Sequence, residues 1–143
     1  MEIDLVLAAV DGSYESTAAV RYALAVADRY DARVHAVYVV NEATVEAIGE
    51  DRVDPATVRD ETGDYLDDVA ALADDAGVAC RASVTYGFST RVKHRHPGSV
   101  VLDLAETLSA AFVVVPHDPE GGDSLERAAE YVLAYASQPV LSV

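Results

Sequence analysis

Residues 3–13 of the chain read IDLVLAAVDGS, and this stretch decides the fold. The run from Ile3 to Val10 is apolar apart from one aspartate and is too short for a typical helix. Such a run suits a strand that is buried on both faces. The Asp-Gly pair at 11–12 ends the run as a turn, and Ser13 or Ser16 can cap a following helix. We therefore expect a central strand, a tight turn and a helix at the start of the chain.

Apolar strands and amphipathic helices alternate along the rest of the chain. Further strands are predicted at 34–40, 78–86, 111–115 and 139–143, and further helices at 55–77, 98–108 and 124–136. Residues 42–49 show only a weak pattern, and we predict no regular element there. Because each apolar strand must bury two sides, the alternation predicts a three-layer α/β domain with an open parallel sheet. No linker or repeat divides the chain, so we expect one domain over residues 1–143.

The composition excludes a disordered chain and two classes of partner. Of the 143 residues, 51% are hydrophobic and 24% are charged, which is enough apolar material for one core. The 25 acidic and 10 basic side chains give a formal net charge of −15. A field of that sign opposes contact with nucleic-acid backbones and anionic lipids, so we expect neither nucleic acid nor a membrane as a partner.

The acidic residues also predict a dependence on salt. Aspartates are clustered, for example at Asp67–Asp68 and Asp74–Asp75, and Lys93 is the only lysine. This pattern is typical of the solvated surface of a protein from a halophilic archaeon. Neighbouring carboxylates repel one another in dilute buffer and are screened in concentrated salt, so we expect the chain to fold poorly at low salt.

The cysteine content and the N-terminal sequence indicate the cellular compartment of the protein. Cys80 is the only cysteine, so no intrachain disulfide can form, and its apolar neighbours predict a small buried side chain. The chain runs directly from Met1 into the first strand pattern, and no apolar stretch approaches the ~20 residues that span a bilayer. We therefore expect a cytoplasmic protein.

A ligand site is expected at the carboxyl ends of the strands. Open parallel sheets bind ligands there, where the winding direction reverses, which draws attention to the loops after Val10, Val40 and Val115. Gly12 permits a tight turn, and the Asp11 carboxylate can accept a hydrogen bond from a ribose hydroxyl or an exocyclic amine. Alternatively, Asp11 and Ser13 only end the strand and cap the helix. The residues alone leave both interpretations open.

Two motifs at opposite ends of the chain resemble those of a known family. Ala-Ala-Val-Asp-Gly-Ser at 8–13, followed by Ser16 and Ala18-Ala19, is similar to the opening signature of universal stress proteins. Ala-Glu-Tyr-Val-Leu at 129–133, followed by Pro-Val-Leu-Ser-Val at 139–143, is similar to the closing helix and strand of the same family. The chain therefore resembles universal stress proteins over nearly its whole length.

The resemblance implies a topology, an assembly and a ligand site. The family has five parallel strands in the order 3-2-1-4-5, a Rossmann-like sheet of the adenine nucleotide alpha hydrolase type, and forms homodimers through its last strand, here Pro139–Val143. In its nucleotide-binding members, ATP contacts the aspartate of the first turn, a valine after the second strand and a glycine-rich loop before the last helix. The candidate crevice here consists of Asp11, Gly12, Ser13, Val39, Gly121, Gly122 and Ser124.

The third of these positions departs from the family pattern. In ATP-binding members, glycines let backbone N–H groups approach the phosphate oxygens, whereas residues 116–124 here read PHDPEGGDS. Proline removes a donor, and Asp118, Glu120 and Asp123 would oppose a triphosphate at a cost of about 1 to 4 kcal/mol for each close pair. A bound Mg²⁺ would reverse the sign of this effect, because it binds carboxylate and phosphate oxygens together.

Two hypotheses of function follow. In the first, the chain is a homodimeric regulatory protein of the stress response with a degenerate nucleotide-binding loop and no cofactor. In the alternative, it is an ATP- or AMP-binding sensor that uses Asp11 and Val39 with Mg²⁺. The sequence has no Ser-His-acid order, no P-loop lysine and no paired metal motif, so we expect neither an enzyme nor a metal site. The same scaffold nevertheless supports hydrolases, because a fold alone does not fix function.

The histidines and one basic segment are the remaining polar features. Residues 91–96 read RVKHRH and hold three arginine and lysine side chains together with two of the four histidines. This segment either receives an anion or an acidic partner, or balances charge locally in an acidic protein. We expect His35, which alternates with apolar neighbours, to be packed rather than catalytic, and His117 to lie in a solvated loop.

Overall fold

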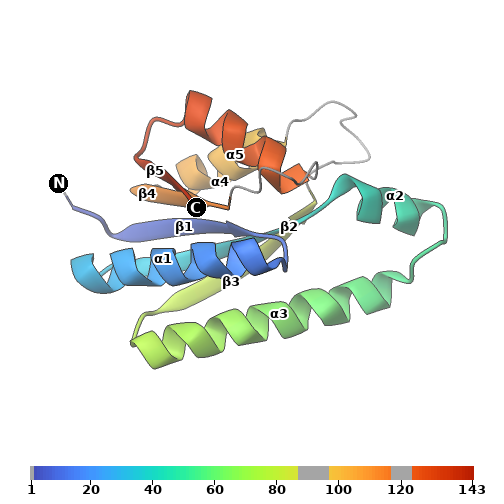
Figure 1. The fold of residues 1–143 in the computed structure, drawn as a ribbon, viewed down its shortest axis with the longest axis horizontal. Coiled ribbons are helices and arrows are strands. Elements are labelled where there is room, and N and C mark those ends of the chain that lie inside the picture. Colours follow the sequence, from blue (N-terminus) through green and yellow to red (C-terminus); the bar gives the residue numbers. More distant parts are fainter. Residues whose placement is uncertain (1, 87–96, 117–123) are drawn as a thin grey trace.

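The computed structural model describes residues 2–86, 97–116 and 124–143 (Figure 1). Its five strands are β1 (Leu5–Val10), β2 (Arg33–Val40), β3 (Cys80–Tyr86), β4 (Phe112–Val115) and β5 (Val140–Ser142). Its helices are α1 (Tyr14–Tyr30), α2 (Glu42–Gly49), α3 (Pro55–Ala76), α4 (Pro97–Thr107) and α5 (Ser124–Tyr135). Every strand pair is parallel and the order is β3-β2-β1-β4-β5, so the predicted fold class is confirmed.

β1 occupies the centre of the sheet because it has no polar residue to expose. All six of its residues are buried, and it pairs with β2 on one side and with β4 on the other. The register places Leu5 beside Arg33 at the start of the two strands and Val10 beside Tyr38 at the end of β1. The prediction of a strand buried on both faces is therefore confirmed for the apolar run.

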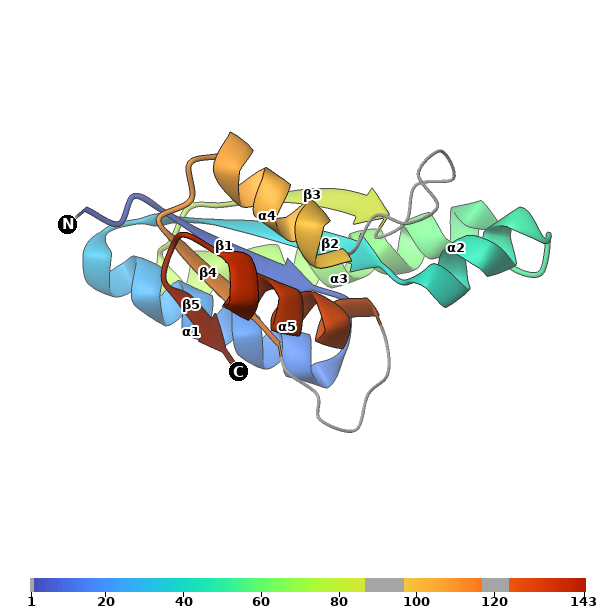
Figure 2. The ribbon, with the colours of Figure 1, turned by 90° about the horizontal axis from the view of Figure 1, so that it is seen from above.

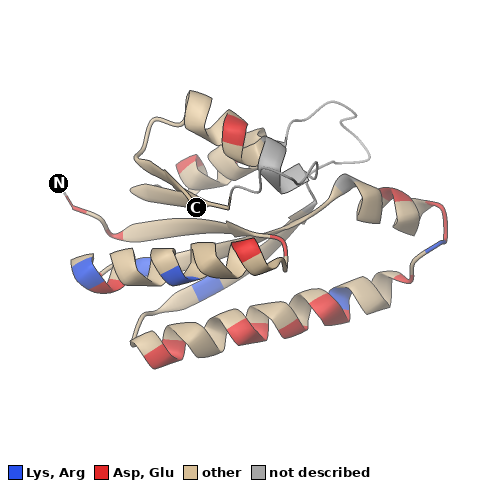
Figure 3. Ribbon diagram, in the orientation of Figure 1, with Lys and Arg blue, Asp and Glu red and all other residues tan. Residues whose placement is uncertain are grey.

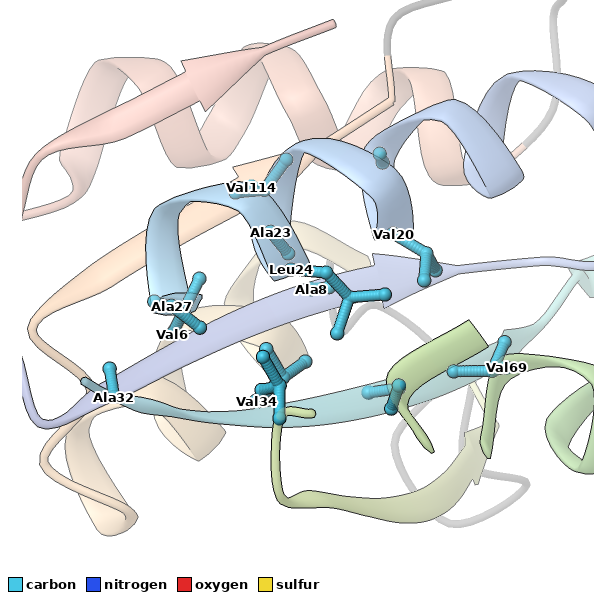
Figure 4. Close-up of a cluster of buried hydrophobic side chains, with 14 of the residues drawn as sticks. Val6, Ala8, Val20, Ala23, Leu24, Ala27, Ala32, Val34, Val69 and Val114 are labelled. Carbon is cyan, nitrogen blue, oxygen red and sulfur yellow. The ribbon is translucent and has the colours of Figure 1, made fainter. Parts of the chain in front are cut away.

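Helices cover both faces of the sheet (Figures 1 and 2). α1 and α3 lie on one face, and α4 and α5 lie on the other. On the first face, Val6 and Ala8 pack in a cluster with residues of α1 and α3 (Figure 4). On the second face, Leu7 packs in another cluster with Val101 of α4 and Val132 of α5. Since side chains alternate between the faces of a strand, β1 contributes to two separate cores.

The helix α2 was not expected from the sequence. Asn41 caps it, because the Asn41 Oδ1 accepts a hydrogen bond from the Thr44 N–H at 2.8 Å. Among the described side chains of α2, Ala47 alone is buried, so the helix has no apolar stripe that a sequence pattern could reveal. Figure 1 shows α2 beyond the end of the sheet, next to the carboxyl end of β2.

Both ends of α3 follow their capping residues. The Asp54 Oδ1 accepts a hydrogen bond from the Ala56 N–H at 2.9 Å, and Pro55 is the first residue of α3. Gly77 ends α3 in the left-handed conformation with φ 69°, as expected. No helix in the described part of the chain combines the length and the apolar character that crossing a bilayer requires.

Candidate functional site

The carboxyl ends of β1 and β2 do not coincide. Val10 is the last residue of β1 and lies beside Tyr38, so Val39 and Val40 continue past β1, and among the described strands they pair with β3 alone. β4 lies on the other side of β1, so the winding direction reverses between β1 and β4. Open parallel sheets bind ligands at such a reversal. The residues after Val10 therefore lie where the sequence predicted a crevice.

Asp11 and Gly12 form the turn that leaves β1. The Asp11 Oδ1 accepts a hydrogen bond from the Ser13 N–H at 2.9 Å, which closes the turn locally. Gly12 has φ +85°, a conformation that side chains rarely adopt, and a Cβ atom added there would lie 2.9 Å from the Tyr38 hydroxyl oxygen. The backbone conformation and the neighbouring phenol therefore both require glycine at position 12.

Ser13 is the cap of α1, and Ser16 lies inside the helix. The Ser13 Oγ accepts a hydrogen bond from the Ser16 N–H at 3.1 Å, and the Ser16 Oγ donates to the Ser13 carbonyl at 3.0 Å. The structural role that the sequence allowed for Asp11 and Ser13 is therefore present. Contact of either residue with a ligand stays a prediction.

Two tyrosines that the sequence analysis did not single out lie behind this turn. The Tyr65 hydroxyl lies 2.7 Å from the Ser16 Oγ and 3.2 Å from the Thr17 Oγ1, so α3 is bonded to the first turns of α1. The ring of Tyr38 packs edge-on against Tyr65 with 5.8 Å between the centroids. The two hydroxyl partners of Tyr65 lie 48 and 49 positions away in the sequence, which is why no local motif reveals these contacts.

Burial and charge both act on the Tyr38 phenol. Burial raises the pKa of Tyr38 above 10.0, and the nearby Asp11 carboxylate raises it further, whereas a hydrogen bond with Thr62 opposes these effects. The phenol therefore stays protonated at neutral pH. A neutral phenol, packed against Gly12, supports the turn without adding charge to the crevice.

Val39 does not offer its side chain to a ligand. It is 1% exposed and packs in the cluster that contains Ala9, Val101 and Val132. A nucleotide could meet Val39 only through the backbone at the free end of β2. The family resemblance implied a contact with this valine, and burial restricts that contact to main-chain atoms.

The remaining predicted crevice residues are only partly described. Gly121 and Gly122 lie outside the described residues, as do His117 and the basic segment 91–96. Ser124 is the first residue of α5. The structure therefore brings together Asp11, Gly12 and Ser13 and places the end of β2 beside them, and it leaves the phosphate side of the proposed crevice untested.

His35 and Cys80 lie at the other end of the strands. The His35 Nε2 is 2.9 Å from the Ser83 Oγ, and burial, followed by the charge of Arg81, lowers the pKa of His35. His35 is partly buried and contacts Ser83, which fits the expectation of a packed or capping histidine only in part. Cys80 is partly buried, and burial raises the pKa of its thiol, which keeps it protonated. Within residues 2–86, 97–116 and 124–143, no group of three or more His, Cys, Asp and Glu side chains could hold a metal ion.

The comparisons with known proteins agree with the fold. Residues 2–143 match the model of the universal stress protein family. A search among curated proteins gave no match. Among solved structures, a protein of the universal stress protein family from Burkholderia pseudomallei is 25% identical, with a TM-score of 0.70 over 99% of this chain and 96% of its own.

Two further solved structures contain adenine nucleotides. The universal stress protein from Archaeoglobus fulgidus, in complex with dAMP, is 18% identical, with a TM-score of 0.67 over 98% of this chain and 96% of its own. A universal stress protein family protein from Arabidopsis thaliana, with AMP bound, is 18% identical, with a TM-score of 0.65 over 98% of this chain and 90% of its own. At this level of identity the two likenesses show the fold alone.

Proposed function

The chain belongs to the universal stress protein family, and we propose that it is a cytoplasmic, homodimeric regulatory protein of the stress response with a degenerate nucleotide-binding loop. In this proposal the protein acts by binding a partner protein and not by catalysing a reaction. The observation that carries the proposal is a contrast within one site. The Asp11-Gly12-Ser13 turn follows β1, where the family resemblance implies a contact with the nucleotide, whereas PHDPEGGDS stands where ATP-binding members have a glycine loop.

The charge of that sequence favours weak binding of a triphosphate. A glycine loop holds phosphate through backbone N–H groups and the positive end of the following helix. Here the segment before α5 contains two prolines and three acidic residues, so it has fewer donors and adds repulsion. A loss of ATP affinity is the expected consequence.

A second candidate function is the binding of an adenosine monophosphate. It is favoured by the two similar folds that hold dAMP and AMP. A monophosphate has fewer charges to oppose the acidic residues than a triphosphate has. In this alternative, Asp11 accepts a hydrogen bond from the ribose, the main chain at Val39 contacts the adenine, and Mg²⁺ offsets the remaining repulsion.

Thermal unfolding with added nucleotide separates the two functions. The protein is heated in molar KCl with Mg²⁺ and either no nucleotide, millimolar ATP or millimolar AMP. A ligand at 100 times its Kd stabilises the folded state by about 2.7 kcal/mol, which gives a clear rise in Tm. The leading proposal predicts no rise with ATP. A rise with AMP that disappears in Asp11→Ala supports the second candidate instead.

The proposed dimer uses the free edge of β5. β5 pairs with β4 on one side, and no described strand lies on its other side. An uncovered edge strand offers N–H and C=O groups to another chain, so pairing of two β5 strands would protect both copies. Light scattering after gel filtration in molar KCl tests this assembly: a mass of two chains supports it, and a mass of one chain removes it.

A further inference from the structure

We propose that Arg33, His35 and Arg81 form a binding pocket for a small organic anion at the amino ends of β2 and β3. This pocket is separate from the crevice at Asp11 and does not depend on the proposed function. The ligand class is a small molecule with a phosphate or carboxylate group and a short apolar portion.

Strand register brings the three basic side chains together. His35 of β2 lies directly beside Arg81 of β3 in the parallel pair, so the two side chains project from the same face of the sheet. Arg33 is two residues before His35 on the same strand and therefore shares that face. The 2.9 Å contact between His35 and Ser83, which also lies on this face, fixes the imidazole ring.

A cavity of about 350 Å³ lies at these residues, which is enough room for a small molecule. The apolar residues Leu5 and Leu108 also line it. The residues that line it include two arginines and one histidine but no aspartate or glutamate. The lining therefore combines positive charge with an apolar wall.

This local charge is opposite to that of the whole protein. The chain has 25 acidic side chains against 10 basic ones, yet within the described residues neither Arg33 nor Arg81 forms an ion pair. Figure 3 shows the same contrast, because acidic segments dominate α3 whereas the coloured segment on β3 is basic. Two guanidinium groups that form no ion pair with any described carboxylate are available to an external anion.

The chemistry of these groups defines the ligand. Guanidinium groups bind phosphate and carboxylate through paired N–H donors, and these charge-assisted bonds are about twice as strong as neutral ones. The imidazole adds a polar contact between the two arginines. Leu5 and Leu108 would pack against the apolar part of the ligand, which favours an organic anion over a bare inorganic ion.

The pocket and the nucleotide crevice lie at opposite ends of the sheet. Leu5 is the first residue of β1 and Asp11 follows its last residue, so the two sites are about 20 Å apart along the strand. Each site can therefore be observed without the other.

Nuclear magnetic resonance with phenyl phosphate and benzoate tests the proposal on the whole chain. The two probes share an apolar ring and differ in the anionic group, so they distinguish phosphate from carboxylate ligands. We expect saturable shifts in the amide signals of Arg33, His35, Arg81 and Ser83, and none at Asp11 or Gly12. Absence of saturable shifts with both probes, or shifts centred on Asp11, would overturn the proposal.

Variants test the role of the arginines. Arg33→Gln and Arg81→Gln should each weaken binding about tenfold, because each removes a charge-assisted pair of hydrogen bonds. Arg59→Gln on α3 is the matched control, since Arg59 is exposed and does not line the cavity. Thermal unfolding confirms that each variant is folded. The double variant carries both Arg33→Gln and Arg81→Gln. If it is folded and binds the probes as tightly as the wild type does, the proposal is wrong. The two arginines would then only offset the negative carboxyl end of α4 near Leu108.

Discussion

The Tyr65 hydroxyl on α3 lies 2.7 Å from the Ser16 Oγ on α1, and this contact joins two helices directly behind the Asp11 turn. Ser16 is fully buried, and its Oγ also donates to the Ser13 carbonyl, so one hydroxyl connects α3, α1 and the cap of α1. Tyr38, which packs on Tyr65, also lies against Gly12. A single polar cluster therefore holds the turn that the proposed nucleotide site needs.

Tyr65→Phe tests this contact. The phenylalanine keeps the ring against Tyr38 but loses the hydroxyl, while Ser16 and Thr17 keep the Ser13 carbonyl as a partner. We expect the free energy of unfolding, measured in urea, to fall by about 1 kcal/mol. Tyr14→Phe is the control, because Tyr14 is the first residue of α1 and is 86% exposed. Equal stability of the two variants would show that the hydroxyl does not stabilise the fold.

Gly12→Ala tests the turn itself. A methyl group at φ +85° is strained by about 1–2 kcal/mol, and it would also meet the Tyr38 hydroxyl. We expect a loss of stability of about 2 kcal/mol or more, and a smaller loss when Tyr38→Phe removes the hydroxyl that is in the way. Denaturant unfolding of the two single variants and the double variant measures this coupling. If the two effects simply add, the contact between Gly12 and Tyr38 carries no strain.

Gly63→Ala is the matched control for that substitution. Gly63 lies inside α3, and a Cβ atom added there meets nothing within 4 Å. Alanine is favoured over glycine in a helix interior by about 1 kcal/mol, so this variant should be more stable than the wild type. We therefore expect Gly12→Ala to lower the free energy of unfolding and Gly63→Ala to raise it. Such a result would show that the loss at position 12 comes from the turn and not from replacing a glycine as such.

The sequence predicted the parts of the molecule that depend on residues close together in the chain. The buried run of β1 and the turn at Asp11 could be predicted because the apolar pattern is continuous and the bond from Asp11 to the Ser13 N–H spans two residues. The helix α2 was missed because it has no buried stripe, although Asn41 caps it. Asp11 and Ser13 were predicted as site residues from the same local turn, and their contact with a ligand stays a prediction.

Contacts between distant segments could not be predicted. The bonds from Tyr65 to Ser16 and the pairing of His35 with Arg81 depend on how α3 and β3 pack after the chain has folded. Gly98 is a similar case, because a Cβ atom added to it would lie 2.5 Å from the Tyr131 Cβ, which shows how closely α4 and α5 approach. In the sequence, Gly98 is only a residue near the start of a predicted helix.

His35 should make stability depend on pH. Its pKa in the folded chain is lowered from the ordinary value of 6.5, first by burial and then by Arg81. Between the lowered pKa and 6.5 the unfolded chain binds more protons than the folded chain, so stability rises with pH across this window and the contribution is constant above it.

The measurement is urea unfolding of the wild type and of His35→Gln between about pH 5 and 8. We expect the difference in free energy between the two proteins to change as the pH falls below 6.5, with the wild type losing more stability than the variant. Ser83→Ala should reduce the stability of the wild type without removing this pH dependence, because the burial of the ring remains. A difference that is constant with pH would contradict the lowered pKa.

The acidic face of α3 should make the fold depend on salt. α3 has seven acidic residues and one arginine, and Asp60, Asp64 and Asp68 follow one another at helical spacing (Figure 3). Each like-charge pair at this spacing costs about 0.2–0.5 kcal/mol. Asp64→Asn removes two such pairs, so we expect it to stabilise the protein in dilute buffer and to lose this advantage in molar KCl, where charges are screened within about 3 Å. Thermal unfolding across a KCl series measures the stabilisation in dilute buffer and its loss in molar KCl. Asp4→Asn is the control, because Asp4 lies outside α3. If Asp64→Asn raises the thermal stability equally in dilute buffer and in molar KCl, then salt does not stabilise the protein by screening the repulsion on α3.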